Sequence, residues 1–277
     1  MSPEGPNGPG WSVLSRLPMD SPARAIIVAL LVCSVCAALI ATAVHFLAPY
    51  QKQNRERQRS ARVQETIGAV PGLADVIGAA SEAQVEARLV ELETGSYVEH
   101  PDPSRFDPEA AARDAATGSR LPPERDLAGI GWRAHHATVF LVVGASRELR
   151  LLILPVYGTG YASTLRGFLA LDADLDTVRG LTFYEHGETP GMGAEIEDAT
   201  WLAKWPGKRL RDDRGNLRIG VRRPDTSSTG DAARYEVDGI SGATRTGIGI
   251  TNLLRFWLGP DGFGPYLQRL EREGTAS

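Results

Sequence analysis

A long uninterrupted hydrophobic run near the N-terminus dominates the hydropathy pattern of this chain. Residues 25–47 read AIIVALLVCSVCAALIATAVHFL, with His45 as the one potentially charged side chain. As a helix this run spans about 35 Å, which is enough for a hydrocarbon core of about 30 Å. The run is longer than the hydrophobic region of a cleaved signal peptide, and no small-residue cleavage site follows it. The pattern predicts one transmembrane helix over residues 25–48.

The sequence is polar on both sides of the run. Residues 1–24 form a tail before it, and residues 49–67 are charged and predict a helical stalk that continues into water. Basic residues are more numerous after the run than before it, so the positive-inside rule alone places the large domain, residues 68–277, in the cytoplasm. That rule is weaker for large translocated domains, so charge leaves the orientation open.

Beyond the stalk, short segments rich in β-branched and aromatic residues alternate with turn residues, which is typical of strands. Pro recurs between residues 100 and 126, which predicts a surface loop with one short helix. Residues 246–258 carry apolar side chains at helical spacing and stop at Gly259 and Pro260. We expect an α+β fold, with a mostly antiparallel sheet and flanking helices. The expected strands are 138–143, 150–156, 167–171, 178–184, 217–222 and 235–237, with a hairpin over 89–98 turning at Thr94 and Gly95.

Composition narrows the possible functions. Apolar residues make up 42% and charged residues 23% of the chain, as in ordinary globular proteins, which argues against a multi-span membrane protein. The net charge is -4 and no basic stripe is interleaved with aromatic residues, so no nucleic acid partner is expected. Cys33 and Cys36 both lie in the hydrophobic run, without a second CxxC pair to complete a metal site. We expect them to be small packing residues of the helix.

A segment rich in glycine and hydroxyl groups lies between a predicted strand and the predicted helix. It reads DGISGAT over residues 238–244. Backbone N–H groups at a helix start, beside glycines that permit close approach, favour a phosphate group. The hydroxyls suit a bound phosphate or a phosphate ester equally, and an ordinary turn with Ser or Thr as helix cap explains the same residues. Ser241 nearly matches a GxSxG nucleophile elbow, but the last glycine is missing and no His follows His186, so hydrolase chemistry is not expected.

A second glycine-rich loop follows the predicted strand 178–184. It reads HGETPGMG over residues 186–193, where Pro and Gly fix a tight loop and Glu188 and Thr189 supply an acceptor and a hydroxyl. Such a loop suits a planar ring system, although an ordinary loop leading into a helix explains it as well. We expect His186, beside a strand end, to be a hydrogen-bonded structural residue.

Two other patterns are weaker. Residues 157–164 read YGTGYAST and resemble the start of a dinucleotide fingerprint, but Ser163 stands at the third glycine and a strand follows. No nicotinamide site is therefore expected, and any hydride from NADH must be received by another subunit. His135 and His136 lack further ligands at metal spacing, so no metal site is expected.

Five motifs in this order resemble the C subunit of the sodium-translocating NADH:quinone reductases: YGTGYASTLRGF, TFYEHGETPGMGAEI, WLAKWPGKRL, DGISGATRTG and FWLGPDGFGPYL. The likeness includes the N-terminal span, LVELETGSYVE, FDPEAAARD and WRAHHATVFLV, so it covers nearly the whole chain. The G subunit of the Rnf ferredoxin:NAD oxidoreductase complex shares the FMN-binding core, here about residues 138–258, but not the FWLGPDGFGPYL ending.

The resemblance implies an FMN that a separate flavin transferase attaches through its phosphate to Thr244, whereas Thr246 lies outside the motif. It also implies a recognition and phosphate-cradling loop and a set of residues near the flavin ring. The loop residues are Asp238, Ser241, Gly242 and Ala243, and the ring residues are Glu188, Thr189, Gly191, Met192, Gly193, Tyr161, Ser163, Thr164 and Lys208. Family members often read GLWST where this chain has GYAST and GLG where it has GMG, which affects the ring contacts more than the tether.

The resemblance further implies a bacterial inner membrane, a periplasmic domain and other membrane subunits of the same complex as partners. The chain would relay electrons through its FMN without a complete active site of its own. Sodium would pass elsewhere, because one apolar helix offers no ion path. Two other functions stay open: a G-type subunit of an Rnf complex, and a membrane-anchored envelope domain that binds a ligand without redox chemistry.

Overall fold

The computed structural model describes residues 22, 26–27, 29–38, 84–223 and 230–274 and divides the chain into two compact units, Met1–Arg59 and Ser60–Ser277. In the first unit residues 29–38 are helical, and both cysteines are exposed there, so the packing expected for them is not found among the described residues. Within the described ranges no helix is long and apolar enough to cross a bilayer. The predicted span is described only in part, and the predicted stalk lies outside the described residues.

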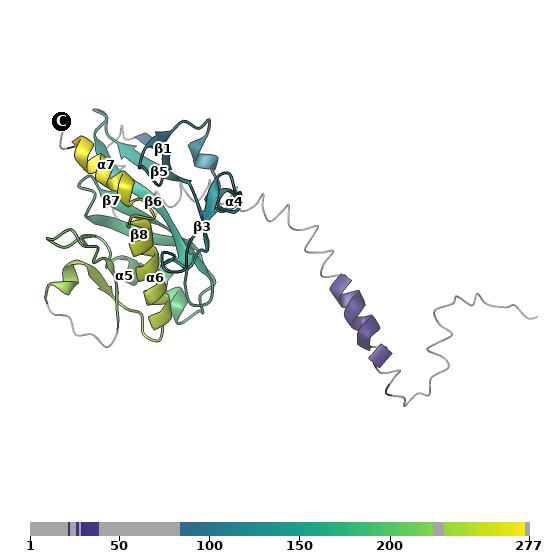
Figure 1. The fold of residues 1–277 in the computed structure, drawn as a ribbon. Helices are drawn as coiled ribbons and strands as arrows, with labels where there is room; N and C mark the ends of the chain where they lie inside the picture. The colour runs from purple at the N-terminus through teal and green to yellow at the C-terminus, as the bar shows by residue number, and fades with distance from the viewer. Residues whose placement is uncertain (1–21, 23–25, 28, 39–83, 224–229, 275–277) are drawn as a thin grey trace, which may run out of the picture. The chain divides into compact units, whose positions relative to one another are not determined.

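The second unit is built on one six-stranded sheet with the order β2-β1-β5-β6-β7-β8 (Figure 1). All neighbouring strands in it are antiparallel. The four expected long strands and the hairpin are confirmed, and the hairpin turn has Gly95 at φ 73°. The strands are β1 (Gln84–Glu91), β2 (Tyr97–Val98), β5 (His136–Val143), β6 (Leu149–Thr159), β7 (Thr164–Asp172) and β8 (Val178–Glu185).

Both faces of the sheet are apolar, in keeping with the two-residue period of strands. Along β6, Leu152 and Leu154 belong to the larger core, whereas Leu151 and Ile153 belong to a smaller cluster on the other face. The larger core is covered by α6 (Thr244–Trp257) and α7 (Gly264–Gly274) (Figure 1). Helix α6 packs on β6, which places its first turn near the end of that strand.

The remaining elements are short. The predicted strands at 217–222 and 235–237 are present as β9 and β10, but they form a separate parallel pair instead of extending the main sheet. The loop over 100–126 contains one α-helix, as predicted, and also a 3-10 turn and β3, which pairs with β4. These elements are η1 (Pro103–Arg105), α4 (Pro108–Arg113), β3 (Gly118–Arg120), β4 (Trp132–Ala134), η2 (Gly193–Glu197), α5 (Ala199–Leu202), β9 (Gly220–Arg222), η3 (Ala232–Arg234) and β10 (Glu236–Asp238).

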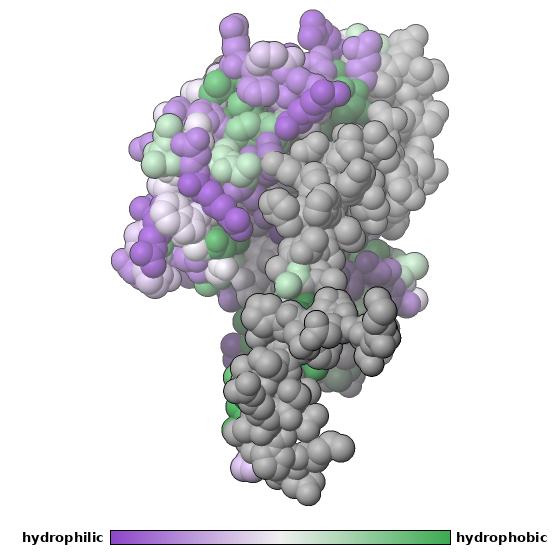
Figure 2. Space-filling model, turned by 90° about the vertical axis from the view of Figure 1, so that its right-hand side faces the viewer, coloured by the Kyte–Doolittle hydropathy of each residue, from purple (hydrophilic) through white to green (hydrophobic). Residues whose placement is uncertain are grey.

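The described surface seen in Figure 2 is mainly hydrophilic, with hydrophobic residues in small separate patches. Single exposed hydrophobic side chains are normal on a protein surface. Two of the large ones, Tyr161 and Met192, are 59% and 46% exposed and lie in two of the loops singled out from the sequence.

Candidate functional site

Three segments that are far apart in the sequence meet at the N-terminal end of α6. They are the turn between β6 and β7, the loop after β8 and the first turn of α6, which includes the last residue of the DGISGAT segment. The contacts that join them are hydrogen bonds to Glu188 and a cation-π contact between Arg245 and Tyr161. The three glycine-rich patterns of the sequence therefore form one site.

Helix α6 begins at Thr244, two residues earlier than predicted, so the hydroxyl of Thr244 stands on the first residue of the helix. The N-cap is Ala243, which makes no side-chain capping bond, so the alternative of a Ser or Thr cap is wrong. The first amides of a helix have no intrahelical acceptor, and the helix dipole favours an anion beside them. Thr244 is exposed, which leaves its hydroxyl accessible. These features fit a phosphate group at this helix end.

The backbone before Thr244 leaves open space. Gly242 has φ 75°, a conformation that L side chains rarely adopt, and a side chain there would meet only Met192 Sδ at 4.0 Å. Ser241 and Gly242 are both exposed, whereas Ala243 is buried. The loop thus presents its backbone and the Ser241 hydroxyl to solvent next to Thr244, as a phosphate cradle requires.

Two side chains support this loop at its first residue, Asp238. The indole Nε1 of Trp201 donates to the Asp238 carbonyl at 2.9 Å, and the Asp238 carboxylate forms an ion pair with Arg222. Trp201 is only 5% exposed and is carried by α5, whose N-cap is Asp198. Sequence reasoning missed Trp201 and Arg222 as supports, because neither position has a pattern that reveals its partner.

Glu188 is the most enclosed acidic residue of the site, at 5% exposure. Its Oε1 accepts from the backbone N–H groups of Tyr161 at 3.0 Å, Ala162 at 3.0 Å and Ser163 at 3.3 Å. Its Oε2 accepts from the hydroxyl of Thr246 at 2.6 Å. Glu188 therefore contacts the β6–β7 turn and the first turn of α6 at once.

Tyr161 and Met192 supply the exposed apolar surface of the site. The guanidinium of Arg245 lies 5.4 Å from the centre of the Tyr161 ring, close enough for a cation-π interaction. Met192 is held in a loop where the Thr189 carbonyl accepts from the N–H groups of Met192 and Ala194, both at 3.1 Å. An exposed aromatic ring and a thioether beside an anion-binding helix end suit a planar aromatic ligand that carries a phosphate.

The other residues of the two loops are structural or stand at the edge of the site. Ser163 Oγ accepts from the Gly187 N–H at 2.6 Å and ties the turn to the loop after β8. His186 accepts from the Glu188 N–H at 3.2 Å through Nδ1, and its Nε2 lies 2.9 Å from Glu197 Oε1. The expectation that His186 is a hydrogen-bonded structural residue is confirmed. Thr164 opens β7, and Gly191 has φ 72°.

Lys208 lies apart from these contacts. Its Nζ donates to the Ala233 carbonyl at 2.6 Å, and burial, together with the charge of Arg222, lowers the pKa of Lys208. Among the described residues, no hydrogen bond joins the Lys208 side chain to the loops around Glu188. Its assignment to the ring contacts stays a prediction.

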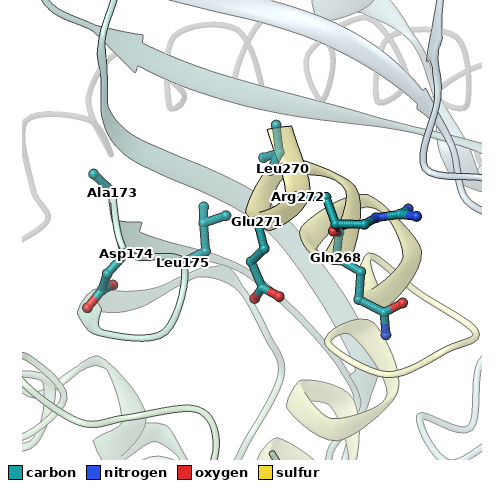
Figure 3. Close-up of a pocket in the computed structure, with 7 residues that line it drawn as sticks. All are labelled: Ala173, Asp174, Leu175, Gln268, Leu270, Glu271 and Arg272. Carbon is teal, nitrogen blue, oxygen red and sulfur yellow. Dashed lines mark hydrogen bonds between the residues drawn. The ribbon is translucent and has the colours of Figure 1, made fainter. Parts of the chain in front are cut away.

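One cavity lies away from this site and a smaller one lies beside it. One of about 740 Å³ lies between the β7–β8 turn and α7, and Figure 3 shows that its lining contains none of the predicted site residues. A smaller one of about 220 Å³ adjoins the β6–β7 turn. It includes Arg166, which binds Glu109 at 2.6 Å and Glu185 at 3.2 Å and so joins α4 to the sheet beside the site. No cluster of three potential metal ligands occurs in the part of the chain that the structure describes.

Comparison with known sequences links this geometry to a flavin. The model of the FMN-binding domain family matches residues 160–259, which begins at the β6–β7 turn and ends just after α6. The C subunit of the Na(+)-translocating NADH-quinone reductase of Pseudomonas aeruginosa is 42% identical over 93% of this chain and 98% of its own length. The protein of the same name from Yersinia pestis is 40% identical over 92% of this chain and 95% of its own length.

Comparison with solved structures agrees. The crystal structure of NqrC from Shewanella oneidensis matches with a TM-score of 0.67 and 32% identity, covering 78% of this chain and 99% of that one. The C subunit of the Na(+)-translocating NADH-quinone reductase from Parabacteroides distasonis matches with a TM-score of 0.55 and 28% identity, covering 79% and 95%. The fold of this chain is therefore similar to that of these two proteins.

Proposed function

The chain belongs to the family of C subunits of the Na(+)-translocating NADH-quinone reductases, and we propose that it carries its FMN as a phosphate ester on Thr244. It is an FMN-carrying subunit of a bacterial inner-membrane oxidoreductase complex, and the other subunits of that complex are its partners. This membership favours the sodium-translocating reductase over an Rnf G-type subunit or a non-redox envelope domain.

The observation that carries the ester proposal is the position of Thr244, an exposed hydroxyl on the first residue of a helix without a side-chain cap. We propose that Thr244 Oγ1 attacks the flavin-side phosphorus of a pyrophosphate-activated flavin such as a flavin dinucleotide. The new O–P bond replaces the P–O bond of the pyrophosphate, a nucleoside monophosphate leaves, and the hydroxyl proton passes to the transferase or to water. A separate flavin transferase performs this step.

The residues of this chain then bind and orient the cofactor. The backbone of Ser241, Gly242 and Ala243 and the N-terminus of α6 hold the phosphate, while Tyr161 and Met192 offer apolar surface for the ring. FMN supplies the electron-transfer chemistry, and the protein sets its potential through these contacts. A covalent tether keeps the cofactor from diffusing away.

We also propose that a single helix over residues 25–48 anchors the chain and that the domain is periplasmic. The hydrophobic run is long enough to span the bilayer, and anchoring raises the effective concentration of the domain beside its partner subunits. A periplasmic domain would lose a non-covalently bound FMN to the periplasm. The proposed covalent tether prevents that loss and so agrees with a periplasmic orientation.

The test is peptide mass spectrometry of the full chain coexpressed with a flavin transferase. Cleavage after Arg234 and Arg245 gives a peptide that contains Ser241 and Thr244 but not Thr246. The expected result is that this peptide gains the mass of one FMN less one water, and that fragmentation assigns the gain to Thr244.

Thr244→Ser is expected to keep the adduct because it keeps the hydroxyl, and Thr244→Ala to lose it. Ser241→Ala is the matched control, since Ser241 is the other exposed hydroxyl of the loop. An adduct that survives in Thr244→Ala, or an unmodified wild-type chain, would refute the proposed ester.

A further inference from the structure

Glu188 is a buried carboxylate that is surrounded by described residues. Its two oxygens accept three backbone N–H groups and one hydroxyl, and the side chain is 5% exposed. A carboxylate has about four lone-pair sites, and here three donors share Oε1 while one donor binds Oε2. Both oxygens of Glu188 are therefore engaged by protein donors, which suits a residue that holds segments together.

Two glycines hold the carboxylate in this position. A side chain at Gly160 would come within 2.5 Å of Glu188 Oε1, and one at Gly193 would come within 2.7 Å of both Glu188 Oε2 and Thr246 Oγ1. The backbone of the β6–β7 turn and that of the loop after β8 therefore approach Glu188 as closely as glycine permits. A larger residue at either glycine would displace the carboxylate or the Thr246 hydroxyl.

We propose that Glu188 is a positioning residue for the flavin. Its hydrogen bonds fix the β6–β7 turn that carries Tyr161 relative to the first turn of α6, which carries Thr244. The inference rests on the proposed attachment of FMN to Thr244. Thr246 is two residues beyond Thr244 in the same helix, a rise of about 3 Å, and its hydroxyl shares the Glu188 carboxylate with the Tyr161 N–H. Two hydrogen bonds thus connect the phosphate anchor to the residue best placed to contact the ring.

A second, independent contact joins the same two segments. Arg245, next to the attachment residue, lies over the Tyr161 ring at 5.4 Å, on the exposed side of the site. The exposed contact is open to solvent and weaker, whereas the Glu188 link is buried and charged, and hydrogen bonds to ionised groups are the stronger class. Glu188 is therefore the main determinant of the geometry between anchor and ring.

This role predicts a change in the electronic environment of the flavin without loss of the tether. Thr246→Val removes the hydrogen bond from Thr246 to Glu188 and nearly keeps the shape of the side chain. Thr246→Ser keeps the hydroxyl and therefore the bond. In Glu188→Met both sides are removed, while Glu188→Gln keeps one oxygen for the backbone N–H groups of the turn.

The experiment uses the full chain coexpressed with a flavin transferase, and it measures the Thr244 adduct, the visible circular dichroism of the flavin and its midpoint potential. We expect Thr246→Val and Glu188→Met to carry the adduct but to lose most of the visible dichroism and to shift the potential. Thr246→Ser should resemble the wild type, and Glu188→Gln should lie between. The double variant Thr246→Val with Glu188→Met should change the dichroism and the potential no more than Glu188→Met alone, because both substitutions break the same hydrogen-bonded link.

Flavinylated Thr246→Val and Glu188→Met chains with wild-type dichroism and potential would overturn the inference and leave the proposed ester intact. If Glu188→Met does not fold, the Thr246→Val and Thr246→Ser pair decides the question alone. A wild-type chain without flavin would refute the proposed ester, and the positioning role would fall with it. The two failures are thus distinguished by mass spectrometry of the wild type.

Discussion

The indole Nε1 of Trp257 donates a hydrogen bond of 2.7 Å to the carbonyl oxygen of Tyr157. Trp257 is the last residue of α6 and Tyr157 lies in β6, so the bond fixes the C-terminal end of the helix to the sheet. Thr246 and Glu188 fix the other end. The helix that begins at Thr244 is therefore held at both ends.

Trp257→Phe is expected to destabilise the domain by about 1–3 kcal/mol, because it leaves the Tyr157 carbonyl without its donor while most of the aromatic packing remains. Urea unfolding of the full chain, followed by far-ultraviolet circular dichroism, measures the change. Trp132→Phe is the control: Trp132 is 45% exposed, and its replacement should change the stability by less than about 0.5 kcal/mol. Equal effects of the two substitutions would show that the Trp257 bond contributes nothing.

Two glycines of α6 should respond differently to alanine. A methyl group at Gly249 would lie 2.6 Å from the Thr159 carbonyl oxygen and 3.0 Å from Gly160 Cα, which are backbone atoms. We expect Gly249→Ala to cost about 1–3 kcal/mol of stability through this overpacking. A methyl group at Gly247 would meet the side chain of Val221 at 3.0 Å, which can move, and alanine gains up to about 1 kcal/mol of helix propensity.

Gly247→Ala should therefore be close to neutral. The same unfolding experiment compares the two variants, and a Gly249→Ala protein as stable as Gly247→Ala would contradict the close approach of α6 to the β6–β7 turn.

Asp198, the N-cap of α5, predicts a pH-dependent contribution to stability. Hydrogen bonds from the Thr200 side chain, and from the backbone N–H groups of Thr200 and Trp201, hold the pKa of the Asp198 carboxyl below its ordinary value of 3.8. A lowered pKa in the folded state stabilises the fold above the ordinary pKa, and this contribution is lost as the pH falls through the folded value.

Asp198→Ala should accordingly lower the melting temperature at pH 7 and lower it less as the solution is acidified below the pKa of Asp198. Asp198→Asn removes the same titrating carboxyl but keeps a cap, so the difference in melting temperature between the Asn and Ala variants is the control and should not change with pH. Thermal unfolding across the acid range tests this, and a pH-independent effect of Asp198→Ala would be the contrary result.

Tyr161 is expected to contact the flavin ring rather than its tether. In Tyr161→Ala the Thr244 adduct should persist, and the flavin fluorescence should rise because an aromatic neighbour that quenches it is gone. Val85→Ala, which alters an exposed side chain on β1, serves as the control and should leave the fluorescence unchanged. Unchanged fluorescence in flavinylated Tyr161→Ala would place the ring elsewhere.

The proposed orientation predicts a difference between two kinds of membrane preparation. Protease added to spheroplasts should digest residues 84–274, whereas the same domain should be protected in sealed inverted vesicles. A cytoplasmic marker protein reports on leakage of the spheroplasts, and a periplasmic marker enclosed in the inverted vesicles reports on leakage of the vesicles. Digestion confined to inverted vesicles would place the domain in the cytoplasm, as the positive charges after the hydrophobic run suggest by themselves.

The long strands of the sheet followed from the sequence because their residues carry the signal locally. The ends of β6 and β7 did not: Gly158 and Thr159 read as turn residues, yet they continue the pairing of β6 with β7. Helix α7 was missed because Gly264 and Pro265 at its start suggest a loop, although Tyr266 and Leu267 are buried against the core.

The site, like the fold, was predicted only where the sequence signal is local. The three loops were found from glycines and hydroxyls, which are local features. The function of Glu188 was not found, since its partners are 27 residues before it and 58 residues after it, and no spacing rule connects them. Thr246 lies outside the motif, yet it is the residue through which the helix reaches Glu188.

The exposure of Thr244 bears on the order of events during biogenesis. Thr244 is exposed on a helix whose two ends are held by hydrogen bonds, so the proposed flavin transferase can reach it without opening the core. The proposed attachment of the flavin to Thr244 can therefore follow the folding of the domain.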